Sequence, residues 1–282
     1  MHPILIQTGN FTLHTFGLMA ALGVLAGSTV VLREARREKV DEELIRRITF
    51  AAVVATIVGG RLLDVLVNWE RFAGQPLEAL KIWKGGLVFY GGGIGIMTVL
   101  VASAWLSKRP LLQLTDIFSP GGMAGLAFGR VGCLMAGDDY GKPTTLPWGI
   151  RFTDEHSLVP YELRGVPLHP TQIYMMLNAV FIFLVLRWLA PRKRFQGQVT
   201  ATMFILYAIN RSIIELFRGD EDRGFLFNHT LSTSQFISIW VGLAGVAIYV
   251  WKGRGAARAA EATPEAPRPE APPDAPTSAS SG

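Results

Sequence analysis

The chain has 282 residues, 50% of them hydrophobic, and its mean hydropathy is above zero, which excludes an ordinary soluble domain and indicates a membrane protein. Its formal net charge of +5 does not predict a nucleic-acid partner, because the Lys and Arg residues lie beside apolar runs and form no single basic face. The single cysteine, Cys133, excludes an intramolecular disulfide and a paired-cysteine metal or redox site.

Seven apolar runs are long enough to cross a bilayer, for which a helix needs about 20 residues. They are 12–32, 48–67, 85–106, 111–135, 171–189, 199–217 and 234–251. Their apolarity is continuous rather than alternating, which predicts helices and not a β-barrel. The start of the chain lacks the basic region of a signal peptide, so the first run is expected to be a retained span. In the fourth run, the pair Pro120-Gly121 favours a break in the helix beside a cavity.

The distribution of positive charge predicts the orientation of these spans, because Lys and Arg accumulate on the cytoplasmic side. The segments on one side, with Arg187, carry 16 Lys and Arg residues, and those on the other side carry 8. The sequence therefore predicts an all-α polytopic membrane protein with its N-terminus outside (periplasmic) and its C-terminus in the cytoplasm. Residues 1–252 are expected to form the seven-helix membrane domain. Residues 253–282, rich in Ala, Pro and Ser, are expected to form a disordered cytoplasmic tail.

Two arginines, Arg130 and Arg211, lie inside apolar runs that are far apart in the sequence. An arginine at membrane depth costs about 2.5 kcal/mol or more, so two of them indicate a cavity or an anionic ligand. Arg130 alone fits equally well with a side chain that snorkels to a helix end. Tyr207, Arg211, Glu215 and Arg218 recur at spacings of 4, 4 and 3, which places them on one helix face. We expect Glu215 to neutralise one arginine, and an ion-pair ladder with only a structural role is the alternative.

The third run opens with six glycines among residues 85–95, a density that predicts close helix packing. Tyr90 stands among these glycines, where anchoring at the membrane interface is its simplest role. Arg61 and Asp64, three residues apart, are interpreted as a structural ion pair.

Two adjacent carboxylates, Asp138 and Asp139, follow the fourth run in a glycine-rich segment. Acidic neighbours in a loop are usually only solvated, but their closeness to Arg130 makes one of them a candidate ion-pair partner or proton acceptor. His169 precedes the fifth run in His169-Pro170-Thr171-Gln172, where Pro-Thr is typical of a helix start. This histidine is therefore interpreted as a loop or cap residue rather than a base.

Together these motifs resemble the bacterial prolipoprotein diacylglyceryl transferase family over roughly residues 11–251. The most specific match is the signature Gly-Arg-x-Gly-Asn-x-x-x-Gly-Glu, present here as Gly129-Arg130-Val131-Gly132-Cys133-Leu134-Met135-Ala136-Gly137-Asp138. Supporting matches lie in the segments 13–19, 59–61, 85–92, 169–174 and 207–218. Four positions depart from the more familiar form of the family: Cys133 for Asn, Asp138 for Glu, Phe16 for Tyr and Tyr90 for His.

The resemblance implies that phosphatidylglycerol donates its diacylglyceryl group to the lipobox cysteine of a prolipoprotein, at the periplasmic side of the bacterial inner membrane. Glycerol 1-phosphate would leave, and no metal or cofactor is expected. Arg130 and Arg211 would bind the lipid phosphate. Tyr90 would orient the headgroup or the thiol, and Asp138 would accept the thiol proton or hold Arg130. Supporting roles would fall to Gly91, Gly92, Gly141, His169, Gln172, Tyr207, Glu215 and Arg218.

A non-catalytic lipid-binding or lipid-flipping membrane protein is the main alternative, because it could use the same arginines without chemistry. A flippase needs a polar path to the inner leaflet, and the inner halves of the runs offer little besides Asp116. A seven-helix receptor or sensor is disfavoured, because no cytoplasmic segment between the runs is long enough for an output domain.

Overall fold

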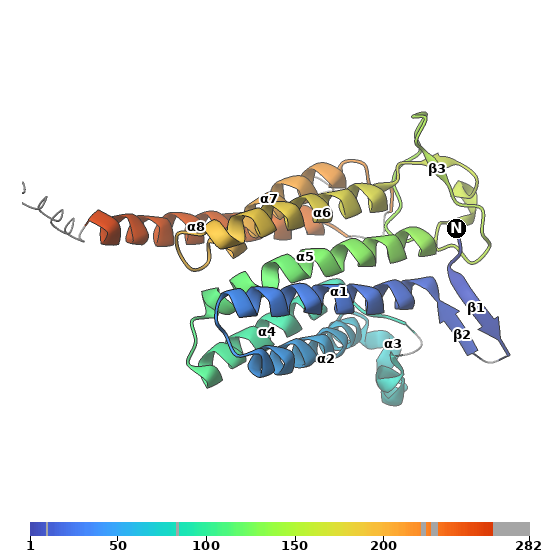
Figure 1. The fold of residues 1–282 in the computed structure, drawn as a ribbon. Coiled ribbons are helices and arrows are strands. Elements are labelled where there is room, and N and C mark those ends of the chain that lie inside the picture. The colour runs from blue at the N-terminus through green and yellow to red at the C-terminus, as the bar shows by residue number, and fades with distance from the viewer. Residues whose placement is uncertain (10, 83–84, 221–223, 227–230, 262–282) are drawn as a thin grey trace, which may run out of the picture.

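The computed structural model describes residues 1–9, 11–82, 85–220, 224–226 and 231–261 (Figure 1). Long helices dominate this part of the chain: α1 (Thr15–Arg37), α2 (Glu42–Val67), α4 (Phe89–Ser107), α5 (Leu111–Ala136), α6 (Thr171–Leu189), α7 (Gln198–Glu215) and α8 (Thr233–Glu261). Between them lie the short helices α3 (Trp69–Ala73), η1 (Pro76–Leu80), η3 (Tyr161–Leu163) and η4 (Ala190–Arg192). Three antiparallel hairpins pair β1 (Ile4–Thr8) with β2 (Phe11–His14), β3 (Ile150–Arg151) with β4 (Pro167–Leu168), and β5 (Phe225–Leu226) with β6 (Leu231–Ser232).

Five helical segments of the described chain are long and apolar enough to cross a membrane. They are Thr15–Arg37, Glu42–Val67, Phe89–Ser107, Thr171–Arg192 and Thr233–Ala256. This result confirms the prediction of a helical membrane protein. Helices α5 and α7 are not among these five, so their crossing of the membrane stays a prediction; both carry buried ionic residues, such as Asp116, Arg130 and Arg211.

Helix α5 lies in the middle of the bundle, between α1 and the group formed by α6, α7 and α8 (Figure 1). It approaches α1 closely because small residues face each other. A Cβ on Gly27 would lie 2.8 Å from the carbonyl oxygen of Gly121. On the other side of α1, α2 packs against α4 in the same way, and a Cβ on Gly91 would overlap the carbonyl oxygen of Gly59. This contact confirms the close packing predicted for the glycine-rich start of α4.

The break expected at Pro120-Gly121 is not observed, because α5 is one continuous helix with Pro120 inside it. Proline removes one helical hydrogen bond, but this turn is buried among neighbouring helices that hold its geometry. The Asp116 carboxylate, one turn earlier, accepts hydrogen bonds from the backbone N–H groups of Gly197 (2.8 Å) and Thr200 (2.9 Å) at the start of α7. Asp116 therefore ties α5 to α7 and has a structural role.

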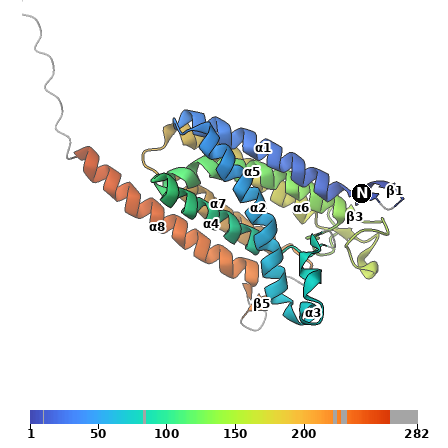
Figure 2. The same cartoon turned by 90° about the horizontal axis from the view of Figure 1, so that it is seen from below.

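Several element boundaries differ from the predicted ones, since α2 begins at Glu42 rather than at residue 48 and α4 at Phe89 rather than at residue 85. The first span was expected to begin at residue 12, but Phe11–His14 is strand β2 and the helix starts at Thr15. The tail was expected to be disordered from residue 253, but α8 continues to Glu261 and its end projects from the bundle (Figure 2). The remainder of that predicted tail, 262–282, lies outside the described residues.

Candidate active site

The buried arginines gather at the end of the bundle that also carries the three hairpins. Arg130 lies near the last turns of α5, and Arg211 lies in the last turn of α7. Helices α4 and α8 begin at this same end, with Tyr90 and Ser234 in their first turns. Both arginine side chains are buried. The structure thus brings together charges that are about 80 residues apart in the sequence.

Asp139 is the centre of this arginine cluster. One of its carboxylate oxygens contacts Arg130, and the other accepts from Arg218 at 2.6 Å. Burial by itself would raise the pKa of the Asp139 carboxyl, but the positive charges of Arg130, Arg218 and Arg211 outweigh burial and lower that pKa. The ion-pair partner of Arg130 is therefore Asp139, which confirms that one of the two carboxylates pairs with this arginine and corrects the alternative in which Asp138 holds it.

The Asp138 carboxylate accepts a hydrogen bond from the backbone N–H of Asp139 at 2.9 Å, and the backbone of Asp138 is held by the start of α6. The Gln172 side chain donates to the carbonyl oxygen of Asp138 at 2.7 Å, and the Thr171 hydroxyl donates to that of Asp139 at 2.5 Å. The Asp138 side chain is exposed at the surface. Loss of water to the surrounding protein and the negative charge of the adjacent Asp139 nevertheless raise the pKa of the Asp138 carboxyl. A carboxylate with a raised pKa is a better proton acceptor than an ordinary one.

Cys133 completes a small group of possible metal ligands. Its sulfur and one carboxylate oxygen each of Asp138 and Asp139 lie within 4.8 Å of one another, the one such group found in the described ranges. Arg130 and Arg218 already engage Asp139, and two cations at this point favour an anion over a metal ion. The chemistry of the group therefore does not itself indicate a metal centre.

Arg218 does not share the helix face predicted for it, because α7 ends at Glu215. It instead forms an isolated antiparallel bridge with Gly141, which belongs to the segment that follows α5. A Cβ on Gly219 would lie 2.7 Å from the Gly141 carbonyl group, so the two chains meet closely. Arg218 also pairs with Asp220, with 2.9 Å between Nε and Oδ1. Burial lowers the pKa of the Arg218 guanidinium, but Asp220 and Asp139 raise it by more, so it stays charged.

Arg211 is paired as predicted, because its Nη1 contacts the Glu215 carboxylate one turn later. Its Nη2 donates to the hydroxyl of Ser234 at 3.0 Å. The same hydroxyl lies 3.0 Å from the phenolic oxygen of Tyr90. Tyr90 is thus connected to Arg211 through one side chain from α8.

Several supporting residues have clear packing roles. His169 lies directly before the N-terminal cap of α6, with its ring 5.2 Å from that of Phe217 and its Nδ1 3.2 Å from the Tyr174 hydroxyl. This position confirms the interpretation of His169 as a loop residue. Tyr207 packs against the apolar cluster Met123, Ile182, Leu186, Ala190 and Val199. Gly92 faces Thr56 of α2, whose methyl group would lie 2.9 Å from an added Cβ.

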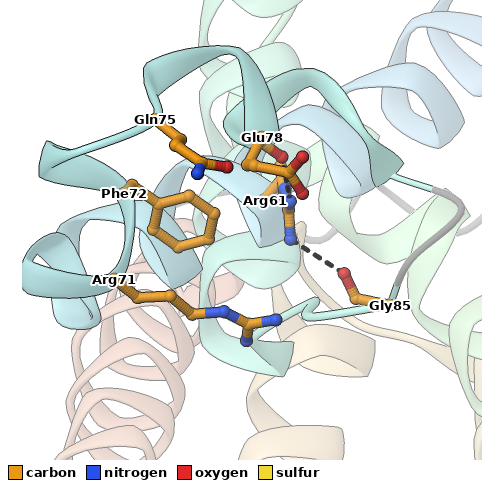
Figure 3. Close-up of a pocket in the computed structure, with 6 residues that line it drawn as sticks. All are labelled: Arg61, Arg71, Phe72, Gln75, Glu78 and Gly85. Carbon is orange, nitrogen blue, oxygen red and sulfur yellow. Dashed lines mark hydrogen bonds between the residues drawn. The ribbon is translucent and has the colours of Figure 1, made fainter.

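The Arg61–Asp64 pair is structural, as predicted, with 2.9 Å between Nη1 and Oδ2. Arg61 also donates to the carbonyl oxygens of Glu78, Ala79, Gly85 and Gly86. A cavity of about 320 Å³ lies beside it, lined also by Arg71, Phe72 and Gln75 (Figure 3). The hydrogen bonds of Arg61 fix the segment that leads into α4, so this arginine contributes to the placement of Tyr90.

The fold and the site define a helical membrane protein with a buried arginine cluster at one end of its bundle. The family model for prolipoprotein diacylglyceryl transferase matches residues 3–251, so the chain belongs to this family.

Relatives named phosphatidylglycerol–prolipoprotein diacylglyceryl transferase support this assignment. One from Clostridium tetani is 32% identical, over 88% of this chain and 97% of the relative. One from Paracidovorax citrulli is 33% identical, over 91% of this chain and 97% of the relative. A third, from Finegoldia magna, is 34% identical, over 83% of this chain and 89% of the relative.

Proposed function

We infer that this protein transfers the diacylglyceryl group of phosphatidylglycerol to the cysteine thiol of a prolipoprotein lipobox. The observation that carries the proposal is the pairing of Arg130 and Arg218 with the one carboxylate of Asp139, close enough to Arg211 for its charge to act on that carboxylate, in a chain that belongs to the transferase family. A phosphate diester is an anion of the right chemistry for such a cluster, because the planar guanidinium matches phosphate oxygens. Arg130 also keeps one donor available, since its buried Nε has no hydrogen-bond partner within the described ranges.

The reaction is an alkyl transfer from oxygen to sulfur. A bond forms between the cysteine sulfur and the terminal glyceryl carbon of the lipid, and the bond from that carbon to the phosphate oxygen breaks. The products are a thioether and glycerol 1-phosphate, and the thiol proton goes to an acceptor. The arginines stabilise the negative charge that grows on the phosphate as the carbon–oxygen bond breaks.

The other side chains of the site have separate roles in the reaction. Asp138 is the proton acceptor, because it is the carboxylate in the cluster that is paired with no arginine of the described ranges and its pKa is raised. Tyr90 orients the headgroup or the thiol through its hydroxyl. Glu215 keeps Arg211 in place, and Gln172 keeps the backbone of Asp138 in place. Neither a metal nor a cofactor has a step in this scheme.

The site is proposed to face the periplasm, in a protein whose long helices all cross the inner membrane. This orientation rests on the charge bias between the two sets of connecting segments. It also suits the substrates, because a prolipoprotein cysteine and the outer-leaflet lipid meet on that side.

We expect a reporter enzyme that is active only outside the cytoplasm to be inactive when fused after Gly255 and active when inserted near Glu155. A reporter that is active only in the cytoplasm serves as the control and should give the opposite pattern. If the first reporter were active after Gly255 and silent near Glu155, the orientation would be inverted and a periplasmic site would be ruled out.

The proposed activity is tested with the full-length protein in vesicles that contain phosphatidylglycerol labelled in its diacylglyceryl part. A lipobox peptide should gain the label and the mass of a diacylglyceryl group, whereas a peptide with Ser in place of the lipobox cysteine should gain neither. Retention of labelled lipid on the protein, without any labelled peptide, would instead support the non-catalytic lipid-binding alternative.

A further inference from the structure

The Ser234 hydroxyl joins two of the groups that the proposed function uses. It lies 3.0 Å from Nη2 of Arg211 and 3.0 Å from the phenolic oxygen of Tyr90. These partners come from α7 and α4, whereas Ser234 lies in the first turn of α8. Three helices therefore meet at one hydroxyl group.

The chemistry of the three groups fixes part of the hydrogen-bond pattern. A guanidinium only donates, so the Ser234 oxygen accepts from Arg211. A hydroxyl has one hydrogen and two lone pairs, so Ser234 keeps its hydrogen and a second lone pair for Tyr90. The bond from Arg211 is charge-assisted and stronger than a neutral one, and it polarises the hydroxyl toward Tyr90. The position of the tyrosine oxygen is thereby tied to the position of the arginine charge.

Other serines in the long helices are used differently. Ser28 and Ser212 each donate to a carbonyl oxygen four residues earlier in their own helix, at 2.6 and 2.8 Å. Such local bonds are the usual way for serine to satisfy its hydroxyl within a helix. Ser234 follows the first residue of α8, Thr233, so no residue of this helix lies four positions earlier, and its hydroxyl meets the side chains of two other helices instead.

We propose that Ser234 is a positioning residue for the transfer reaction, which sets the geometry between Arg211 at the lipid phosphate and Tyr90 at the headgroup or thiol. The inference rests on the proposed function for its catalytic consequence. Arg211 Nη1 is held by Glu215 and Nη2 by Ser234, so the guanidinium plane is fixed from two sides. Preorganisation of this kind lowers the reorganisation needed when charge develops on the phosphate.

The kinetic test compares Ser234→Ala with Ser234→Thr in the full-length protein in phosphatidylglycerol vesicles. Loss of the hydroxyl should lower kcat about tenfold, which corresponds to one hydrogen bond in the transition state, with little change in KM for the lipid. Ser234→Thr retains a hydroxyl and should recover most of the rate. Ser238→Ala, which removes another buried hydroxyl one turn further along α8, is the matched control and should keep the wild-type rate.

A double substitution separates positioning from a general loss of stability. If Ser234 acts through the link between Arg211 and Tyr90, the rate losses of Tyr90→Phe and Ser234→Ala should combine in the double variant to less than their product, because both changes break that link. Rates whose losses multiply would overturn the proposal, as would a Ser234→Ala protein that is as active as Ser238→Ala.

A spectroscopic measurement decides the question without relying on turnover. With 3-fluorotyrosine at position 90, Arg211→Lys should move the fluorine NMR resonance when Ser234 is present and leave it unmoved in the Ser234→Ala background. An equal displacement in both backgrounds would show that Ser234 does not couple the two residues. A wild-type protein without transfer activity would contradict the proposed function, while this fluorine experiment would still decide the role of Ser234.

Discussion

Replacing Arg130 or Arg211 by alanine is expected to lower diacylglyceryl transfer by at least about 100-fold, because each change removes a donor aimed at the charge that grows on the phosphate. Arg130→Lys and Arg211→Lys should also be poor, since lysine keeps the charge but loses the planar fork that fits two phosphate oxygens. The measurement is the initial rate of thioether formation, with the amount of folded protein in the membrane determined in parallel.

Arg187→Lys provides the matched control for these substitutions. Arg187 also forms an ion pair, with the buried carboxylate of Glu34, but at the opposite end of the bundle and with its own side chain exposed. Its substitution should leave transfer close to normal. Near-normal turnover in both lysine variants of the cluster would show that Arg130 and Arg211 serve only as structural ion pairs.

The second large effect is expected at the proton acceptor. A free cysteine thiol has a pKa near 8.5, so only a few per cent is thiolate at neutral pH and an acceptor accelerates the reaction. Asp138→Asn should lower transfer about 100-fold or more, the usual contribution of a general base. Tyr90→Phe should retain measurable activity, because a neutral tyrosine with a reference pKa near 10 is a poor base and its role is orientation.

The raised pKa of Asp138 gives this prediction a pH dependence with a definite sign. The carboxyl accepts a proton only when ionised, so activity should fall as the pH decreases through its folded-state pKa, above the usual range for aspartate. The acid limb should be absent from the residual activity of Asp138→Asn. An inactive Tyr90→Phe protein beside an Asp138→Asn protein active across the pH range would reverse the two assignments.

The long helices could be predicted from the sequence because continuous apolar runs of this length form few other structures in lipid. Their ends could not, for two different reasons. Phe11 and Leu13 are as apolar as the helix that follows, so hydropathy does not separate β2 from α1. At the other end of the chain, residues 252–261 are rich in Ala, a strong helix former, but a composition poor in aromatics was interpreted as disorder.

Site residues could be predicted from the sequence where a charged side chain interrupts an apolar run, because burying a charge is costly. The roles of two adjacent residues with the same side chain could not be told apart. Arg130, Arg211 and Glu215 are noticeable because they interrupt apolar runs. Asp138 and Asp139 have the same side chain, and the backbone decides which one meets the arginines. Asp139 adopts a left-handed conformation, with φ of +55°, directly after the turn that ends α5. Gly137 is a local signal for the end of α5, but no local pattern predicts which of the two carboxylates after it meets the arginines.

Ser234 was missed for another reason. Serine is common in membrane helices, and nothing in the segment around Ser234 indicates contacts with residues 23 and 144 positions away in the sequence. Only the packing of α4, α7 and α8 brings these side chains together.

The claim that the arginine cluster stabilises a departing phosphate can be tested by following one oxygen atom. Phosphatidylglycerol is prepared with ¹⁸O in the oxygen that links the diacylglyceryl carbon to phosphorus, and it is incubated with the wild-type protein and a lipobox peptide. We predict that every labelled oxygen released appears in glycerol 1-phosphate, one for each thioether peptide formed. A peptide product that carries the ¹⁸O, or thioether without labelled glycerol 1-phosphate, would contradict cleavage of the carbon–oxygen bond and with it the role assigned to Arg130 and Arg211.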